Sequence, residues 1–209
     1  LVQLRARETI ETFDVQFREL MLSFRKHTGV WPRHIVVLRD GVSDSEMIRT
    51  ASIELHCIRK SWAMLSDDCV ESRPTYTYIT IQKRHLTRFY QPADGQDGYK
   101  TYVNVPSGTV VDSVVVSPVL FDFYLASQIG VIEMCYRLCF LYARCRIPVS
   151  LPCPVYYAHR VCEKAKEVYK SLLNRKVFDN LSEENHDRRK IEIEKRLSVN
   201  HQYPGMHFV

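Results

Sequence analysis

An aspartate stands where a buried strand is predicted to end. Four apolar residues, 35–38, run without alternation and are followed by Arg39 and Asp40. Such a run is typical of a strand covered on both faces, and ligands of such sheets gather beyond the strand ends. Asp40 is therefore a candidate acid in a cleft. The alternative is that Asp40 and Gly41 simply form a turn.

A second group of candidates is basic. The segment QKRHLTR, residues 82–88, contains Lys83, Arg84, His85 and Arg88 and directly follows a predicted strand. Cations of this kind, with Phe89 and Tyr90 beside them, suit a nucleic-acid backbone, because phosphate contacts dominate affinity there. The alternative is an ordinary solvated basic strand end.

A third group lies near the start of a predicted helix. His159 and Lys164 belong to the segment PVYYAHRVCEKAKEVYK. A helix N-terminus with cations nearby is suited to binding anions. The alternative is that His159 is a packing residue.

Helices and strands alternate around these candidates. Apolar residues at steps of three and four predict an amphipathic helix over 8–27, with Gly29 as its stop. SDSE, residues 43–46, has capping-box spacing before a second helix that reaches Leu65. The apolar positions of the two helices are Ile10, Phe13, Phe17, Leu20 and Phe24 in the first, and Met47, Ala51, Leu55, Ile58, Trp62 and Leu65 in the second.

The remaining segments extend this alternation. Predicted strands cover 34–38, 76–81, 109–116 and 120–127, and predicted helices cover 131–145 and a last segment from Tyr157 to Leu172. Residues 91–108 form an exposed excursion, and residues 174–200 form a mobile charged loop or a solvated helix. The order of elements predicts an α/β fold with a mixed sheet covered on both sides.

Composition sets broad limits. The 209 residues suffice for one domain with a real core, and the net charge of +5 permits a polyanionic partner without requiring one. Seven cysteines without a CxxC pair or paired zinc-site spacing indicate reduced, buried thiols in an intracellular protein. We expect no membrane span or signal peptide, and the absence of an initiator Met suggests a piece of a longer protein.

Six blocks in a fixed order resemble the PIWI domain of eukaryotic Argonaute proteins. They are RDGVSDSEM, ITIQKRHLTRFY, NVPSGTVVD, FDFYLAS, YRLCFLYARC and PVSLPCPVYYAH, and the match runs from RARETIETF to the terminal GMHFV. The resemblance implies a ribonuclease-H-like mixed sheet flanked by helices, with residues 1–209 as a partial PIWI domain. It also implies small-RNA-guided gene silencing in the cytoplasm, with the nucleus left open, and no membrane partner.

The resemblance further implies a metal-dependent endoribonuclease, or slicer, site. Asp40 matches the second aspartate of the family, Glu8 its glutamate and His159 its histidine. Asp40 and His159 would be metal ligands, with Mg²⁺ or Mn²⁺ as cofactor, because hard cations prefer oxygen ligands and two ions stabilise an in-line displacement. The first aspartate lies on an earlier strand that this sequence does not contain, so we expect no cleavage by this chain alone.

The same resemblance implies RNA-binding residues. Lys83, Arg84 and Arg88 match residues that hold the guide backbone, Tyr142 and Arg144 match further phosphate contacts, and Lys164 stands where the family often has an arginine for the guide 5′ phosphate. The expected partners are a small guide RNA, a complementary target RNA, and the MID and PAZ domains of a longer chain.

One departure leaves the function open. Only VIEMC, residues 131–135, stands where the family has about two dozen more residues, including an apolar strand. Loss of an interior strand leaves unpaired edges on its neighbours. The chain is thus either part of a slicer, or a non-cleaving module that binds guide RNA or silencing partners, or a degenerate fragment that does not fold alone.

Overall fold

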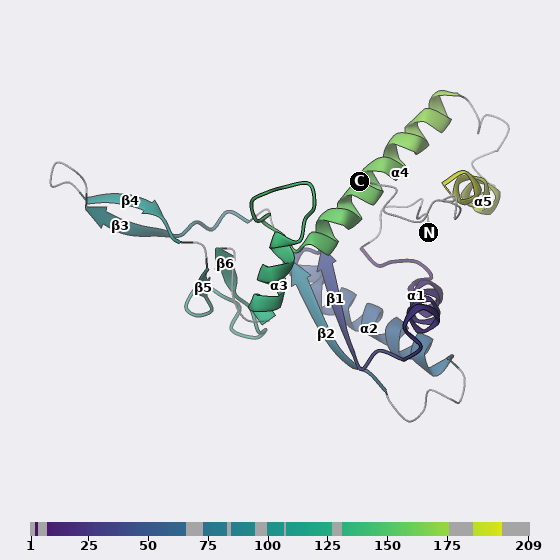
Figure 1. The fold of residues 1–209 in the computed structure, drawn as a ribbon, viewed down its shortest axis with the longest axis horizontal. Helices are drawn as coiled ribbons and strands as arrows, with labels where there is room; N and C mark the ends of the chain where they lie inside the picture. The colour runs from purple at the N-terminus through teal and green to yellow at the C-terminus, as the bar shows by residue number, and fades with distance from the viewer. Residues whose placement is uncertain are drawn as a thin grey trace. The chain divides into compact units, whose positions relative to one another are not determined.

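The structure is a computed structural model, and it divides the chain into two compact units. It describes residues 3, 8–65, 73–82, 85–94, 100–106, 108–126, 131–175 and 186–197. The first unit contains residues 1–82 and 161–208, and the second contains residues 83–160 with Val209. Figure 1 shows helices and short strands in alternation, in agreement with the predicted α/β class. The described strands form three two-stranded sheets, β1–β2, β3–β4 and β5–β6, and not the single mixed sheet that was predicted.

The first unit is built on a parallel strand pair. β1 (His34–Asp40) pairs with β2 (Thr75–Ile81) in a register that runs from His34 opposite Thr75 to Asp40 opposite Ile81. Parallel strands need a crossover connection, and helix α2 (Met47–Ala63) supplies it. Both strands and the second helix are therefore confirmed, and Asp40 is the last residue of its strand.

The capping box predicted at SDSE is wrong. Ser43 makes no side-chain cap bond, and its hydroxyl oxygen lies 3.4 Å from that of Ser45. A short 3₁₀ helix over Asp44–Glu46 precedes α2, so the first turn is tighter than the capping motif requires.

Helix α1 (Phe13–Thr28) begins five residues later than predicted. Its N-cap, Thr12, has φ 53° and ψ 32°, in the left-handed region that β-branched residues rarely adopt. Such a conformation costs about 1–3 kcal/mol and persists only where surrounding contacts enforce it. Glu8 therefore lies outside the helix. The C-terminus is as predicted, because Gly29 has φ 77° and its N–H bonds to the Arg25 carbonyl at 2.8 Å.

The face that α1 presents to α2 differs from the predicted stripe. Phe17 is buried, but Leu20 and Phe24 are 61% and 41% exposed. Met21 packs instead against Trp62 and Leu65 in the core, where the Trp62 ring also meets Trp31 at 5.3 Å between centroids.

A polar contact also joins the two helices. Lys60 Nζ donates to Asp14 Oδ2 at 2.7 Å, and this hydrogen bond lowers the pKa of the Asp14 carboxyl. The Ser61 hydroxyl donates to the Asp14 carbonyl at 2.6 Å. The contact line on α1 therefore passes through Asp14, Phe17 and Met21, at steps of three and four.

The second unit contains two antiparallel pairs. β3 (Tyr90–Asp94) pairs with β4 (Lys100–Asn104), so the predicted excursion carries two paired strands. β5 (Thr109–Val111) pairs with β6 (Tyr124–Ala126), and both are shorter than predicted. Val114 has φ 65°, which no extended strand can include.

The helices of the C-terminal half are α3 (Val131–Phe140), α4 (Cys153–Asn174) and α5 (His186–Leu197). The predicted helix over 131–145 therefore ends five residues early. Within the second unit, buried apolar residues gather at Cys139, Leu151, Cys153 and Val155. Burial, together with the neighbouring Cys135 and Cys153, raises the pKa of the Cys139 thiol to about 11.

The described cysteines agree with the predicted thiol state, but the predicted burial is wrong for Cys145 and Cys162, which are exposed. The six of them in the described ranges are all free. Among the helices that the structure describes, none combines the length and apolar character needed to cross a membrane. Residues 186–197 of the charged segment form helix α5, and the side chain of Ile193 in this helix is fully buried.

Truncation of the α2 core tests this packing. Ile58 is 0% exposed, so Ile58→Ala is expected to lower the free energy of unfolding by about 2–5 kcal/mol through lost burial and a residual cavity. The matched control is Ile48→Ala on the same helix, where the side chain is 59% exposed. Its expected effect is within about 0.5 kcal/mol. Urea unfolding measures both, and equal losses would contradict the assigned core.

Candidate functional site at the end of strand β1

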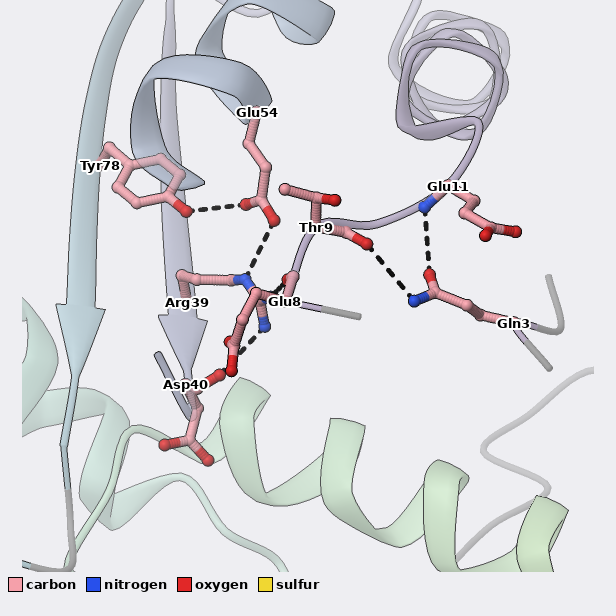
Figure 2. Close-up of polar contacts among 8 residues, drawn as sticks. All are labelled: Gln3, Glu8, Thr9, Glu11, Arg39, Asp40, Glu54 and Tyr78. Carbon is pink, nitrogen blue, oxygen red and sulfur yellow. Dashed lines mark hydrogen bonds and ion pairs between the residues drawn. The ribbon is translucent and has the colours of Figure 1, made fainter. Parts of the chain in front are cut away.

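Arg39 and Asp40 end β1 with their side chains on opposite faces of the strand pair. Successive strand residues alternate between the two faces. Arg39 reaches the side covered by α2, where it meets Glu54, and Figure 2 shows the Asp40 carboxylate directed away from that contact. Asp40 is half-buried. Arg39 thus supplies a cation to the side of the strand pair that α2 covers, and Asp40 supplies an acid on the opposite side.

A turn follows Asp40 directly, as the alternative interpretation required. Gly41 has φ 78°, a value that favours glycine. Gln82, just past β2, donates through its amide to the Val42 carbonyl at 3.2 Å and to Asp44 Oδ1 at 2.6 Å. These bonds fix the turn against the end of the neighbouring strand, so a turn and a strand-end acid coexist here.

The Arg39 guanidinium connects three parts of the first unit. Its Nε donates to Glu54 Oε1 at 3.1 Å, and one terminal nitrogen donates to the Asp40 carbonyl at 3.0 Å. The other terminal nitrogen donates to the Glu8 carbonyl (Figure 2). Because the guanidinium is planar and presents its donors in fixed directions, these contacts set residues 8–12, the Glu8 segment, beside the end of β1.

Glu54 is the buried partner of Arg39. Its side chain is 1% exposed, and Oε2 accepts a hydrogen bond of 2.7 Å from the Tyr78 hydroxyl of β2. Burial, and then the bond to Glu54, raises the pKa of the Tyr78 hydroxyl. Tyr78 therefore remains a protonated donor at neutral pH. A buried carboxylate is tolerated where it is paired and hydrogen-bonded, and Glu54 meets both conditions.

The Glu8 segment has a second anchor on its other side. The Gln3 side-chain amide donates to the Thr9 carbonyl at 3.3 Å, and its oxygen accepts the Glu11 N–H at 3.0 Å. In Figure 2 this bridge spans the chain between Glu8 and the start of α1. The segment that carries Glu8 is thus held from both ends, while the Glu8 side chain itself is exposed.

In the second unit, Tyr124 contacts the C-terminal end of the basic cluster, residues 82–88. The His85 and Phe89 rings lie 5.2 and 5.3 Å from the Tyr124 ring, and the Thr87 hydroxyl donates to the Tyr124 hydroxyl at 3.3 Å. Alternate residues therefore face inward. Arg88 is exposed between them, and its guanidinium donates to the carbonyls of His85 and Thr87 at 2.7 and 2.8 Å.

Tyr142 packs against the start of α4. Its ring centroid lies 5.2 Å from those of both Tyr156 and Tyr157, and the Tyr157 hydroxyl accepts the Ala143 N–H at 3.1 Å. Arg144 is exposed in the loop that follows. This aromatic group gives Tyr142 a structural role beside its predicted contact with phosphate.

The other predicted site residues are distributed over both units. His159 is exposed on the part of α4 in the second unit, and Lys164 is exposed on the part in the first. Lys83 and Arg84 lie outside the described residues. Glu8 and Asp40 are the predicted catalytic residues that the first unit brings together, through Arg39.

Sequence reasoning missed Arg39, Glu54 and Tyr78 as parts of the site. A signal existed for Glu54, which lies seven residues after Met47 and four before Ile58, on the apolar stripe of α2. A carboxylate at such a position needs a buried cation. Nothing in the local sequence identifies that cation as Arg39.

The described residues do not by themselves form a metal centre. Within those ranges, no three His, Cys, Asp or Glu side chains are grouped closely enough to hold an ion. Asp40 has the hard oxygen ligands that Mg²⁺ prefers, but a two-metal site needs further carboxylates. Asp40 and His159 as metal ligands therefore remain a prediction.

Removal of Glu54 tests the buried pair. Glu54→Ala would leave the Arg39 charge without its buried partner, so the free energy of unfolding is expected to fall by about 3–5 kcal/mol. The control is Glu46→Ala, which removes an exposed partner of Arg49 at 3.3 Å. Its expected cost is at most about 1 kcal/mol. Denaturant titration compares them, and a small loss in both would refute the buried pair.

Comparisons with known proteins match this chain to a family. A family model described as the Piwi domain matches residues 1–135. Protein argonaute 7 of Oryza sativa subsp. japonica is 35% identical over 181 residues, which are 75% of this chain and 17% of that protein. Putative protein tag-76 of Caenorhabditis elegans is 35% identical over 188 residues, 79% of this chain and 18% of that protein. The chain thus spans less than a fifth of the length of these relatives.

Two solved structures share the fold. The C-terminal lobe of a budding yeast Argonaute matches with a TM-score of 0.63 and 27% identity, over 77% of this chain and 38% of that one. Kluyveromyces polysporus Argonaute with a guide RNA matches with a TM-score of 0.66 and 26% identity, over 82% of this chain and 23% of that one. The predicted ribonuclease-H-like α/β fold and the resemblance to Argonautes are confirmed. This chain belongs to the Piwi domain family.

Proposed function

We propose that this chain acts in small-RNA-guided gene silencing, as a partial PIWI domain over residues 1–209 within an Argonaute protein. The observation that carries the proposal is the contact of Arg39 with both the Glu8 and Asp40 carbonyls, in a chain of the Piwi domain family. That contact brings two of the predicted slicer residues to one strand end. A cytoplasmic location and the MID and PAZ domains as neighbours in the longer protein belong to the same proposal.

The proposed ligand is a small guide RNA, with a complementary target RNA paired to it. The Kluyveromyces polysporus neighbour was solved with a guide RNA, which supports this choice. Of the lysine and arginine residues in segment 82–88, Arg88 lies within the described ranges, and Arg144 and Lys164 are exposed cations elsewhere in the chain. Exposed guanidinium and ammonium groups suit phosphate because each contact releases condensed counterions.

Target cleavage is the further part of the proposal, and it depends on residues beyond this chain. Asp40 would supply hard oxygen ligands to Mg²⁺, with Glu8 and His159 as the other contributors from this sequence. Bound divalent ions would stabilise the charge that develops on the attacking and leaving oxygens. The first aspartate must come from an upstream strand. Without it the chain is a guide-binding module.

RNA binding is tested with 5′-phosphorylated single-stranded RNA and the 209-residue chain. Arg88→Ala should weaken binding about equally for unrelated sequences and reduce the slope of log affinity against log salt by about one, because one phosphate contact is lost. The control is Arg49→Ala, which removes an exposed arginine of α2 in the first unit. Fluorescence anisotropy over a salt series gives both quantities. Identical behaviour of the two variants would rule out Arg88 as a phosphate contact.

Cleavage is tested in the full-length protein with a guide-matched RNA and Mg²⁺. Asp40→Asn should reduce cleavage to background and leave guide affinity unchanged, because it removes a carboxylate and preserves shape. Asp44→Asn, four residues later in the exposed 3₁₀ turn, should retain cleavage. If Asp40→Asn cleaves as fast as the unmodified protein, the catalytic assignment fails.

A further inference from the structure

Tyr78 lies at the start of a chain of contacts that ends at the Glu8 segment. Its hydroxyl donates to Glu54 Oε2 at 2.7 Å, and the other oxygen of that carboxylate accepts from Arg39 Nε at 3.1 Å. Because Glu54 is 1% exposed, water does not replace either partner. The carboxylate therefore has one orientation that satisfies both donors.

The orientation of Glu54 determines that of Arg39. The guanidinium is a rigid plane, so fixing its Nε edge also fixes the direction of the two terminal nitrogens. Those nitrogens bind the carbonyls of Glu8 and Asp40. Figure 2 shows the three links in sequence, from Tyr78 on β2 through Glu54 on α2 to the end of β1.

The Glu8 segment needs such an external hold. Thr12, which ends the segment, has the left-handed φ of 53° that disfavours a β-branched residue. The Gln3 bridge to Thr9 and Glu11 restrains the segment on one side. Arg39 restrains it on the other, so weakening that hold should let residues 8–12 relax.

We propose that Tyr78 is a positioning residue, which acts through Glu54 and Arg39 to hold the Glu8 segment beside Asp40. The inference rests on the proposed function only for the assignment of Glu8 and Asp40 to one cleavage site. Tyr78 touches neither RNA nor the reacting atoms in this assignment. Its hydroxyl donates from β2 to Glu54 on α2, and through this bond it influences the position of the Glu8 segment at the end of β1.

The test removes that hydroxyl and reads local hydrogen exchange. In the 209-residue chain, Tyr78→Phe should raise amide exchange in residues 8–12 about tenfold, read at the Glu11 N–H that donates to Gln3 Oε1, which is the effect expected for loss of one hydrogen bond to a charged group. Exchange in the interior of α2 should stay unchanged. Tyr76→Phe is the matched control, because Tyr76 is a partly buried tyrosine two residues earlier on β2, outside this chain of contacts. It should leave both regions unchanged.

A second variant keeps the proposal falsifiable. Arg39→Lys retains the charge but loses the fork, so it should also raise exchange at residues 8–12. The proposal is overturned if Tyr78→Phe leaves this segment unchanged, or if it raises exchange equally in α2, which would indicate a general loss of stability. Exchange is read without RNA. A chain that fails to bind RNA would therefore refute the proposed function, while the exchange data still decide the role of Tyr78.

Discussion

The buried ion pair between Arg39 and Glu54 is the constraint on which the first unit depends. Taking two charges out of water is unfavourable unless their remaining hydrogen-bonding groups are also satisfied. Here Tyr78 satisfies the carboxylate, and two backbone carbonyls satisfy the guanidinium. The partners come from β1, β2, α2 and the Glu8 segment. The interaction that stabilises the core is thus also the one that shapes the candidate site.

In both units, successive side chains around a candidate residue lie on opposite sides of the chain. In β1, Arg39 faces the helix and Asp40 faces away from it. In residues 85–89, His85, Thr87 and Phe89 pack on Tyr124, which leaves Arg88 exposed. In each case the inward residues make the contacts that hold the segment in place, and the candidate residue lies on the other side of the segment. A one-residue slip of β1 against β2 would exchange the faces of Arg39 and Asp40.

Local patterns predicted the strand end at Asp40 and the crossover helix, because both are written in contiguous residues. They did not predict features that depend on contacts between residues far apart in the sequence. The start of α1 depends on Thr12, whose backbone is left-handed. The face of α1 that packs inward depends on contacts with α2, where Asp14 binds Lys60 and Met21 packs against Trp62. Glu54 is a comparable case, since its cation Arg39 lies 15 residues earlier and its second partner, Tyr78, lies 24 residues later. Such pairings cannot be read from periodicity alone.

The parallel register of β1 and β2 also has a consequence for synthesis. His34 pairs with Thr75, a separation of 41 residues, and the same offset applies up to Asp40 and Ile81. At about 5–20 residues per second, the ribosome needs about 2–8 s to make the partner of a strand that already exists. During that interval β1 has an unpaired apolar edge and Arg39 lacks the Glu54–Tyr78 pair. The strand end that carries Asp40 is therefore completed only after β2 is made, and until then the unpaired edge of β1 can associate with other chains.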